Sequence, residues 1–107
     1  MHKWTVQDRY GNKIYLTQER WDYILDYHAE LVGLRDDLLD TLRKGQRIQD
    51  PVDPRKYKYH GECTALPTDY NTIVIVVKFS THIRAGEGLV PNNFVITAWG
   101  TYVYREG

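Results

Sequence analysis

The spacing of hydrophobic residues changes once along the chain, near Gly45, and divides it into a helical part and a strand-rich part. In the first part, four side chains recur at the i, i+3, i+4 and i+7 positions of one helix face: Trp21, Ile24, Leu25 and His28. Thr17 precedes them and is a suitable N-cap, because its hydroxyl can accept from the first free N–H groups. The pattern predicts a helix that ends near residue 29 and carries a histidine where its buried face meets the surface.

A second helix is predicted over residues 31–44, where leucines repeat at helical spacing: Leu31, Leu34, Leu38 and Leu42. Gly45 suits the position that follows a helix, and Arg43 and Lys44 complement the negative end of the helix dipole. Residues 32–33 are expected to kink or break the boundary with the first helix.

Two short strands are predicted ahead of the helices, over residues 3–7 and 13–16. Residues 8–12 between them have turn chemistry, because Gly11 and Asn12 can adopt positive φ.

After Gly45 the hydrophobic period becomes two, which predicts four further strands over residues 46–49, 55–62, 73–77 and 93–99. The β-branched run at 73–77 predicts the central strand, and residues 101–105 are expected to continue the last one. Loops are predicted at 50–54, 64–71 and 80–92, and the last is long enough to be functional or mobile. The whole pattern predicts one α+β domain over residues 1–107, in which two N-terminal helices pack on one face of a roughly four-stranded antiparallel meander, with a short N-terminal strand pair.

Alternation along the strands sorts their side chains by face. The set expected to face the helices is Ile73, Ile75, Val77 and Phe79, with Phe94, Ile96 and Ala98. The opposite face is expected to hold Val74, Val76 and Lys78, with Val95, Thr97 and Trp99. The sequence leaves open which set of the neighbouring strand joins Lys78 and Thr97: Arg55, Tyr57 and Tyr59, or Lys56, Lys58 and His60. A face with a lysine, a hydroxyl and an aromatic ring suits a phosphate beside a stacked base.

Composition narrows the range of functions. The formal net charge is zero, which argues against tight non-specific binding to a polyanion. Cys63 is the only cysteine, and His2, His28, His60 and His82 lack ligand spacing, so no disulfide, metal or other cofactor is expected. No apolar run is long enough to span a membrane and no secretory leader is recognisable, so we expect a cytoplasmic protein.

Several of these segments resemble the phage-associated branch of the barnase–EndoU–colicin–RelE ribonuclease superfamily. The resemblance covers roughly residues 13–99 and lies in residues 14–17, 19–21, 24, 28–31, 50–51, 74–79 and 94–98, together with the tyrosine-rich strand. It implies two N-terminal helices followed by a four-stranded antiparallel sheet, and cleavage of RNA without a metal. It also implies a toxin that an antitoxin or immunity protein holds in check. The neutral charge departs from the strongly basic RelE-type toxins and argues against ribosome-dependent cleavage.

The resemblance implies a catalytic set of one helical histidine, basic strand residues and a hydroxyl: His28, Lys58 or Lys78, and Thr97. Such a set would promote attack of the RNA's own 2′-OH on the neighbouring phosphate, which leaves a 2′,3′-cyclic phosphate. Basic and aromatic side chains are candidates for substrate binding: Arg20, Arg55, Tyr57, Tyr59, His60, Arg84 and Trp99.

A non-catalytic module that keeps this fold and binds RNA or protein through its tyrosine-rich sheet face is the alternative. In that case His28 is a histidine at the edge of the core, Lys78 and Thr97 are ordinary strand residues, and residues 55–60 form a charged edge strand. The loop at 80–92 is then a plain flexible connection.

Overall fold

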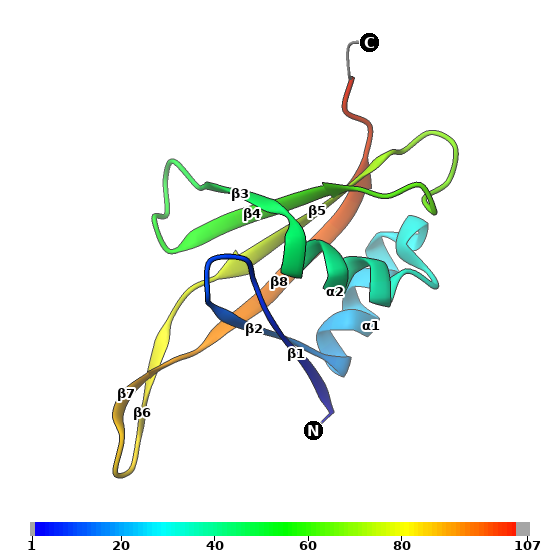
Figure 1. Ribbon diagram of the computed structural model, residues 1–107. Coiled ribbons are helices and arrows are strands. Elements are labelled where there is room, and N and C mark those ends of the chain that lie inside the picture. The colour runs from blue at the N-terminus through cyan, green and yellow to red at the C-terminus, as the bar shows by residue number, and fades with distance from the viewer. Residues whose placement is uncertain (1, 105–107) are drawn as a thin grey trace.

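The structure is a computed structural model that describes residues 2–104, and it has two layers (Figure 1). One layer is a six-stranded sheet in the order β1-β2-β8-β5-β4-β3. Its strands are β1 (Lys3–Gln7), β2 (Lys13–Thr17), β3 (Gln46–Gln49), β4 (Lys56–Glu62), β5 (Thr72–Lys78) and β8 (Asn93–Thr101). The other layer holds α1 (Gln18–Tyr27), a 3₁₀ turn (Ala29–Leu31) and α2 (Arg35–Lys44). The predicted α+β class with two helices is confirmed, but the main sheet has six strands rather than about four.

All strand pairs are antiparallel except one: β2 runs parallel to β8 over Ile14 and Tyr15. This short contact leaves the rest of that β8 edge for α1, which packs against it. The core lies between the layers, where apolar side chains of the two helices pack against those of the central strand β5. Its buried members include Trp21, Ile24, Leu38, Leu42, Ile73, Ile75 and Val77. No helix among the described residues is long and apolar enough to cross a membrane.

The helix boundaries follow local chemistry. Thr17 caps α1 as predicted, since its Oγ1 accepts from the Arg20 N–H at 3.1 Å. The first helix ends at Tyr27, and the His28 N–H donates to the Ile24 carbonyl at 2.8 Å. The second helix begins at Arg35 rather than residue 31, because Gly33 adopts φ +80° and ends the 3₁₀ turn.

Gly45 follows α2 as predicted, but a glycine is needed there because α2 and β4 are packed closely around it. Its φ of −69° and ψ of 156° are open to any residue, so no left-handed cap is involved. A Cβ here would lie 2.5 Å from the Thr41 carbonyl oxygen and 2.7 Å from that of His60. The chain therefore needs a glycine because α2 and β4 pass so closely.

A β-bulge in β8 changes the expected assignment of faces. Thr97 pairs with Val76 and Val95 with Val77, so Ile96 is the extra residue. Alternation therefore restarts within the strand: Val95 and Ala98 are buried, whereas Phe94 and Ile96 are only half-buried. The prediction that Phe94 and Ile96 face the helices with Ala98 was wrong, as was the placing of Val95 on the opposite face.

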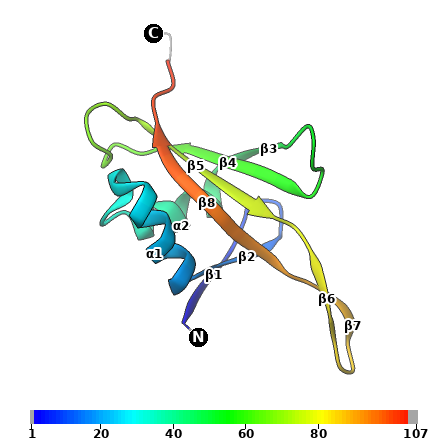
Figure 2. The ribbon, with the colours of Figure 1, turned by 180° about the vertical axis from the view of Figure 1, so that it is seen from behind.

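The segment predicted as a loop over residues 80–92 forms a second, two-stranded sheet from β6 (Thr81–Arg84) and β7 (Gly88–Pro91). Gly86 and Gly88 have positive φ and close its turn. Seen from in front and from behind, this hairpin projects from the end of the sheet that lies away from the helices (Figures 1 and 2). At the other end of β8, the strand stops at Thr101 and residue 105 lies outside the described residues, so the predicted continuation to 105 was too long.

Candidate functional site

The sheet has one face that no helix covers, and we call it the open face. In Figure 2, β8, β5 and β4 cross the molecule with no helix in front of them. Directly paired residues of an antiparallel sheet point to the same side, so the register defines this face. Its rows are Trp99–Val74–His60, Thr97–Val76–Lys58 and Phe94–Lys78–Lys56.

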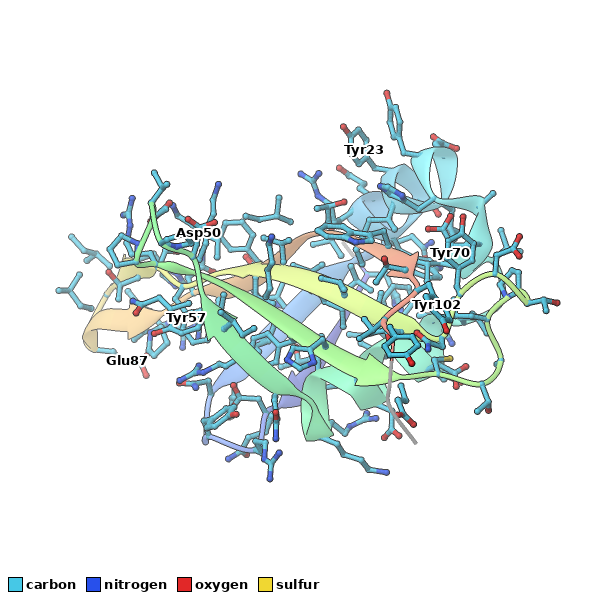
Figure 3. The ribbon with its side chains drawn as sticks, turned by 90° about the horizontal axis from the view of Figure 1, so that it is seen from above. Tyr23, Asp50, Tyr57, Tyr70, Glu87 and Tyr102 are labelled. Carbon is cyan, nitrogen blue, oxygen red and sulfur yellow. The ribbon has the colours of Figure 1, made fainter. Side chains whose placement is uncertain are left out.

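The register settles which side of β4 joins Lys78 and Thr97. Lys56, Lys58 and His60 do so, while Tyr57 and Tyr59 point toward the helix side. Figure 3, viewed from above, shows Tyr57 on the side of the sheet where α2 lies, whereas Tyr23 of α1, the helix beside the β8 edge, stands on the other side. The predicted grouping of Lys78 with Thr97 and Trp99 on one face is confirmed by the pairing.

His28 lies at the border of this face, where α1 ends beside β8. Its ring centroid is 6.3 Å from that of Trp99, with the planes tilted by 40°. Its Nδ1 lies 3.7 Å from Oε2 of Glu30. The same carboxylate oxygen accepts from the Gly100 N–H at 2.8 Å and so fixes the 3₁₀ turn to β8. His28 is therefore held at the edge of the sheet, with about a third of its side chain exposed.

Lys58 completes a short series of contacts across the open face. Its Nζ lies 5.9 Å from the centre of the Trp99 ring, within the range of a cation–π contact. Thr97 lies in the row of Lys58, two strands away, at a Cα separation of about 10 Å given the ~4.8 Å spacing of strands. Val76 lies between them in the same row. The structure thus brings together His28, Trp99, Lys58 and Thr97.

Lys78 is on the same face but already has a partner. Its Nζ donates to Oδ2 of Asp53 at 2.5 Å, in the loop before β4. The hydrogen bond from Lys78, together with the Arg55 N–H, holds the pKa of Asp53 below its usual range. Of the two lysines that the sequence left as alternatives, Lys58 is the one that contacts Trp99, and Trp99 in turn lies against His28.

The remaining predicted binding residues are scattered. His60 shares the row of Trp99 on the open face, and Arg20 packs its guanidinium over the Tyr23 ring at 5.0 Å. Arg55 is exposed, 3.8 Å from Asp53. Arg84 lies on the projecting hairpin, where it pairs with Glu87 at 3.1 Å, and not beside His28.

Tyr59 was a candidate for substrate binding, and this was wrong because its side chain is completely buried. Its hydroxyl donates to the Asp8 carboxylate, and Nη1 of Arg47 donates to that hydroxyl at 3.3 Å. Burial and the Asp8 hydrogen bond raise the pKa of Tyr59. Tyr57 is likewise turned inward, where its ring lies 4.3 Å from the Arg47 guanidinium.

The network of Asp8, Tyr59 and Arg47 is not evident in the sequence. Asp8 belongs to the β1–β2 turn, which folds back over the helix side of β3 and β4 (Figure 1). Burial would raise the pKa of Asp8, but hydrogen bonds from Tyr59, Asn12 and Tyr10 outweigh it and hold the pKa below its usual value. No local pattern links Asp8 to a tyrosine 51 positions away, so only the fold reveals the pair.

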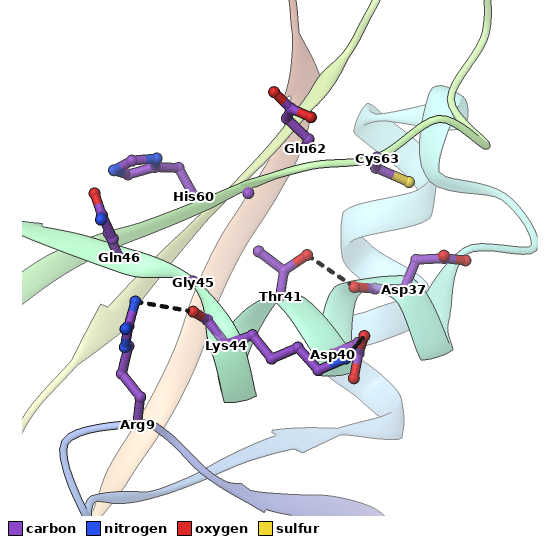
Figure 4. Close-up of a pocket in the computed structure, with 11 residues that line it drawn as sticks. Arg9, Asp37, Asp40, Thr41, Lys44, Gly45, Gln46, His60, Glu62 and Cys63 are labelled. Atoms are coloured by element: carbon purple, nitrogen blue, oxygen red, sulfur yellow. Dashed lines mark hydrogen bonds and ion pairs between the residues drawn. The ribbon is translucent and has the colours of Figure 1, made fainter.

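A separate pocket of about 440 Å³ lies between the end of α2, the start of β3 and the end of β4 (Figure 4). Cations and carboxylates both line it, including Arg9, Lys44, Asp37, Asp40 and Glu62. The side chain of His60 points away from α2 in this view. No group of three or more His, Cys, Asp or Glu side chains suited to a metal ion occurs among residues 2–104.

Comparisons of the chain with protein-family models, with curated proteins and with solved structures find no significant match.

Proposed function

We propose that the protein is a metal-independent endoribonuclease whose active site is the open face around His28, Lys58 and Thr97. The observation that carries the proposal is the series of contacts from His28 to Trp99 and from Trp99 to Lys58. Thr97 lies in the row of Lys58, next to the row of Trp99. It supplies a proton-transfer group, a cation, a hydroxyl and a stacking surface on one exposed face.

In this proposal the RNA phosphate lies over Val76, between Lys58 and Thr97, and a neighbouring base stacks on Trp99. His28 takes the proton of the ribose 2′-OH, and the 2′-oxygen forms a bond to phosphorus. The ammonium of Lys58 and the hydroxyl of Thr97 stabilise the charge that develops on the phosphorane oxygens. The bond from phosphorus to the 5′-oxygen then breaks, and in this proposal His60, which shares the row of Trp99, gives that oxygen a proton. The products are a 2′,3′-cyclic phosphate and a 5′-OH.

The experiment is incubation of the pure protein with a defined single-stranded RNA in EDTA, with analysis of the product ends. We expect cleavage with cyclic phosphate ends, and a loss of at least a hundredfold in rate for His28→Ala, because general acid–base catalysis typically contributes that much or more. Lys44→Ala is the matched control: Lys44 is an exposed cation on α2 that pairs with Asp40, on the other side of the sheet. Intact RNA at high protein concentration, or equal rates for His28→Ala and wild type, would refute the proposal.

We further propose, from the resemblance to toxin ribonucleases, that a partner protein of antitoxin type restrains this activity. Such a partner would have to cover the open face. Ile48, 64% exposed and directly opposite Lys58 on the neighbouring strand β3, is an apolar side chain that such a partner could bury.

The same exposed Ile48 favours the second candidate, a non-catalytic module that binds RNA or protein through this face. His28 already has a ring partner and a carboxylate partner, as a structural histidine would. Binding of RNA that is unchanged in His28→Ala and Thr97→Ala, without cleavage by any form, would support the module over the enzyme.

A further inference from the structure

An exposed row of aromatic and basic side chains leads along α1 to His28, and we call it the tyrosine track. Arg20, Tyr23 and Tyr27 occupy positions i, i+3 and i+7 of α1 and so share one face of the helix. The Arg20 guanidinium lies 5.0 Å from the Tyr23 ring, and the Tyr23 and Tyr27 ring centroids are 4.9 Å apart. Tyr23 is 50% exposed and Tyr27 69%. Two large rings thus contact each other at the surface rather than in the core.

The start of the track continues onto the open face. Arg20 lines a hollow of about 340 Å³ together with Tyr15 and Phe94, whose ring centroids are 6.0 Å apart. Nζ of Lys3 lies 4.7 Å from the centre of the Tyr15 ring. The track therefore runs from Lys3 and Tyr15 through Phe94 and Arg20 to the two tyrosines.

The other end of the track is next in the chain to the proposed active site. Tyr27 precedes His28 in the chain, and His28 contacts Trp99. Figure 3 shows Tyr23 standing up from α1 on the side of the sheet opposite Tyr57, which is the side of the open face. From Arg20 to His28 the helix rises about 12 Å, the length of roughly three bases stacked at ~3.4 Å.

The charges along α1 decide which ligand the track fits. Its cations are Lys3 and Arg20, while Glu19, Asp22 and Asp26 lie on the adjoining outer flank of the helix and Asp22 is bonded to Gln18. A ligand held mainly through its phosphates would be repelled by these acids. A ligand held through its unpaired bases would not, because stacking on an aromatic ring needs no positive groove.

We propose that the tyrosine track binds the unpaired bases of a single-stranded RNA segment next to the nucleotide that reaches His28. This inference rests on the proposed ribonuclease function and adds the substrate class: single strands of several nucleotides, recognised mainly by stacking. Three cations in reach of phosphates, Lys3, Arg20 and Lys58, predict a slope of log K against log salt of about −2 at ~0.7 per contact.

The test is fluorescence anisotropy with a 2′-O-methyl octanucleotide, which cannot be cleaved through a 2′-OH. Tyr23→Leu/Tyr27→Leu is compared with Tyr23→Phe/Tyr27→Phe, which keeps both rings. Because both side chains are exposed, the fold should tolerate either change, and thermal melting checks this. We expect at least a tenfold rise in Kd for the leucine pair and less than twofold for the phenylalanine pair. Cleavage of a dinucleotide, too short to reach the track, should keep its rate in both.

An unchanged Kd in the leucine pair, or equal affinity for a duplex of the same sequence, would overturn the inference and leave the tyrosines as a surface for a protein partner. If no form cleaves RNA but the leucine pair still loses binding, the ribonuclease proposal fails and the track stands. If the protein cleaves RNA but both pairs bind equally well, the track fails and the enzyme stands.

Discussion

Replacing Tyr59 by phenylalanine removes one hydroxyl from the most deeply buried polar network in the described part of the chain. That hydroxyl donates to the Asp8 carboxylate, whose side chain has no exposed surface. Without it, Oδ2 of Asp8 keeps the Asn12 amide at 3.1 Å and the more distant Arg47 at 3.8 Å. A hydrogen bond to a charged group contributes about 1.5–3 kcal/mol, so we expect a loss of about 2 kcal/mol at pH 7. At ~4 °C per kcal/mol for a domain of this size, Tm should fall by about 8 °C.

The loss should depend on pH in a defined direction. The folded pKa of Asp8 lies below its usual value, so Asp8 contributes stability above its unfolded pKa of about 3.9 and loses it as pH falls through the lower folded pKa. Tyr59→Phe removes the hydrogen bond that lowers the pKa of Asp8 most. The burial of Asp8, which raises its pKa, remains. The folded pKa should therefore rise, acid unfolding should begin at a higher pH, and the difference between variant and wild type should shrink once Asp8 is protonated in both.

The assay is urea unfolding at pH 7 and near pH 3, with Tyr57→Phe as the matched control. Tyr57 lies on the same strand and contacts the same arginine, but its hydroxyl makes no hydrogen bond to any residue in 2–104. The control should change stability by less than about 0.5 kcal/mol. Equal losses for the two variants at pH 7, or a loss for Tyr59→Phe that grows toward pH 3, would refute the reasoning.

Three further predictions concern single positions. Gly45→Ala should cost about 1–3 kcal/mol in urea unfolding, because its Cβ would press on backbone oxygens of both α2 and β4; a neutral effect would mean that the two elements can move apart. Lys78→Met should raise the pKa of Asp53 toward its usual value in an NMR titration, since the bond from Lys78 is the main cause of its low value; an unmoved pKa would show that the pair does not form in solution. Arg84→Ala should leave Tm within about 1 °C and RNA cleavage unchanged, because its pair with Glu87 is exposed and on the projecting hairpin; a slower variant would extend the site to that hairpin.

Periodicity was enough to predict most elements of this fold. Both helices, the N-cap at Thr17 and six of the strands appear close to their predicted positions, because one apolar face sets each period. The start of α2 was placed too early because Leu31 and Leu34 fit a helical stripe and are in fact buried. Only the positive φ of Gly33 separates them, and a glycine in a sequence does not state its φ.

The sheet differs from the prediction where one residue alters the alternation. The bulge at Ile96 moves Val95 into the core and Phe94 onto the open face, and no residue type nearby marks it. The β6–β7 hairpin was taken for a loop because its strands lack a buried face: Ile83 and Leu89 are both exposed. A strand that packs on nothing has no hydrophobic alternation for the sequence to display.

The candidate site was predictable where one strand fixed the geometry and unpredictable where distant segments met. Lys78, Thr97 and Trp99 share a face through simple alternation and pairing. The choice of Lys58 over Lys78 needed the Asp53 pair and the Trp99 contact, which join separate loops and strands. Tyr59 looked like a surface aromatic, because nothing in its strand signals the buried Asp8 that binds its hydroxyl.

The most direct measurement of the central claim is the rate of cleavage of one single-stranded RNA oligonucleotide in EDTA by wild type, Lys58→Ala and Lys56→Ala. Both lysines lie on the same face of β4, two positions apart, but only Lys58 lies over Trp99 and in the row of Thr97. The account predicts 2′,3′-cyclic phosphate products, a loss of tenfold or more for Lys58→Ala, and near wild-type rates for Lys56→Ala. Equal rates for the two variants, or RNA that stays intact with every form of the protein, would contradict it.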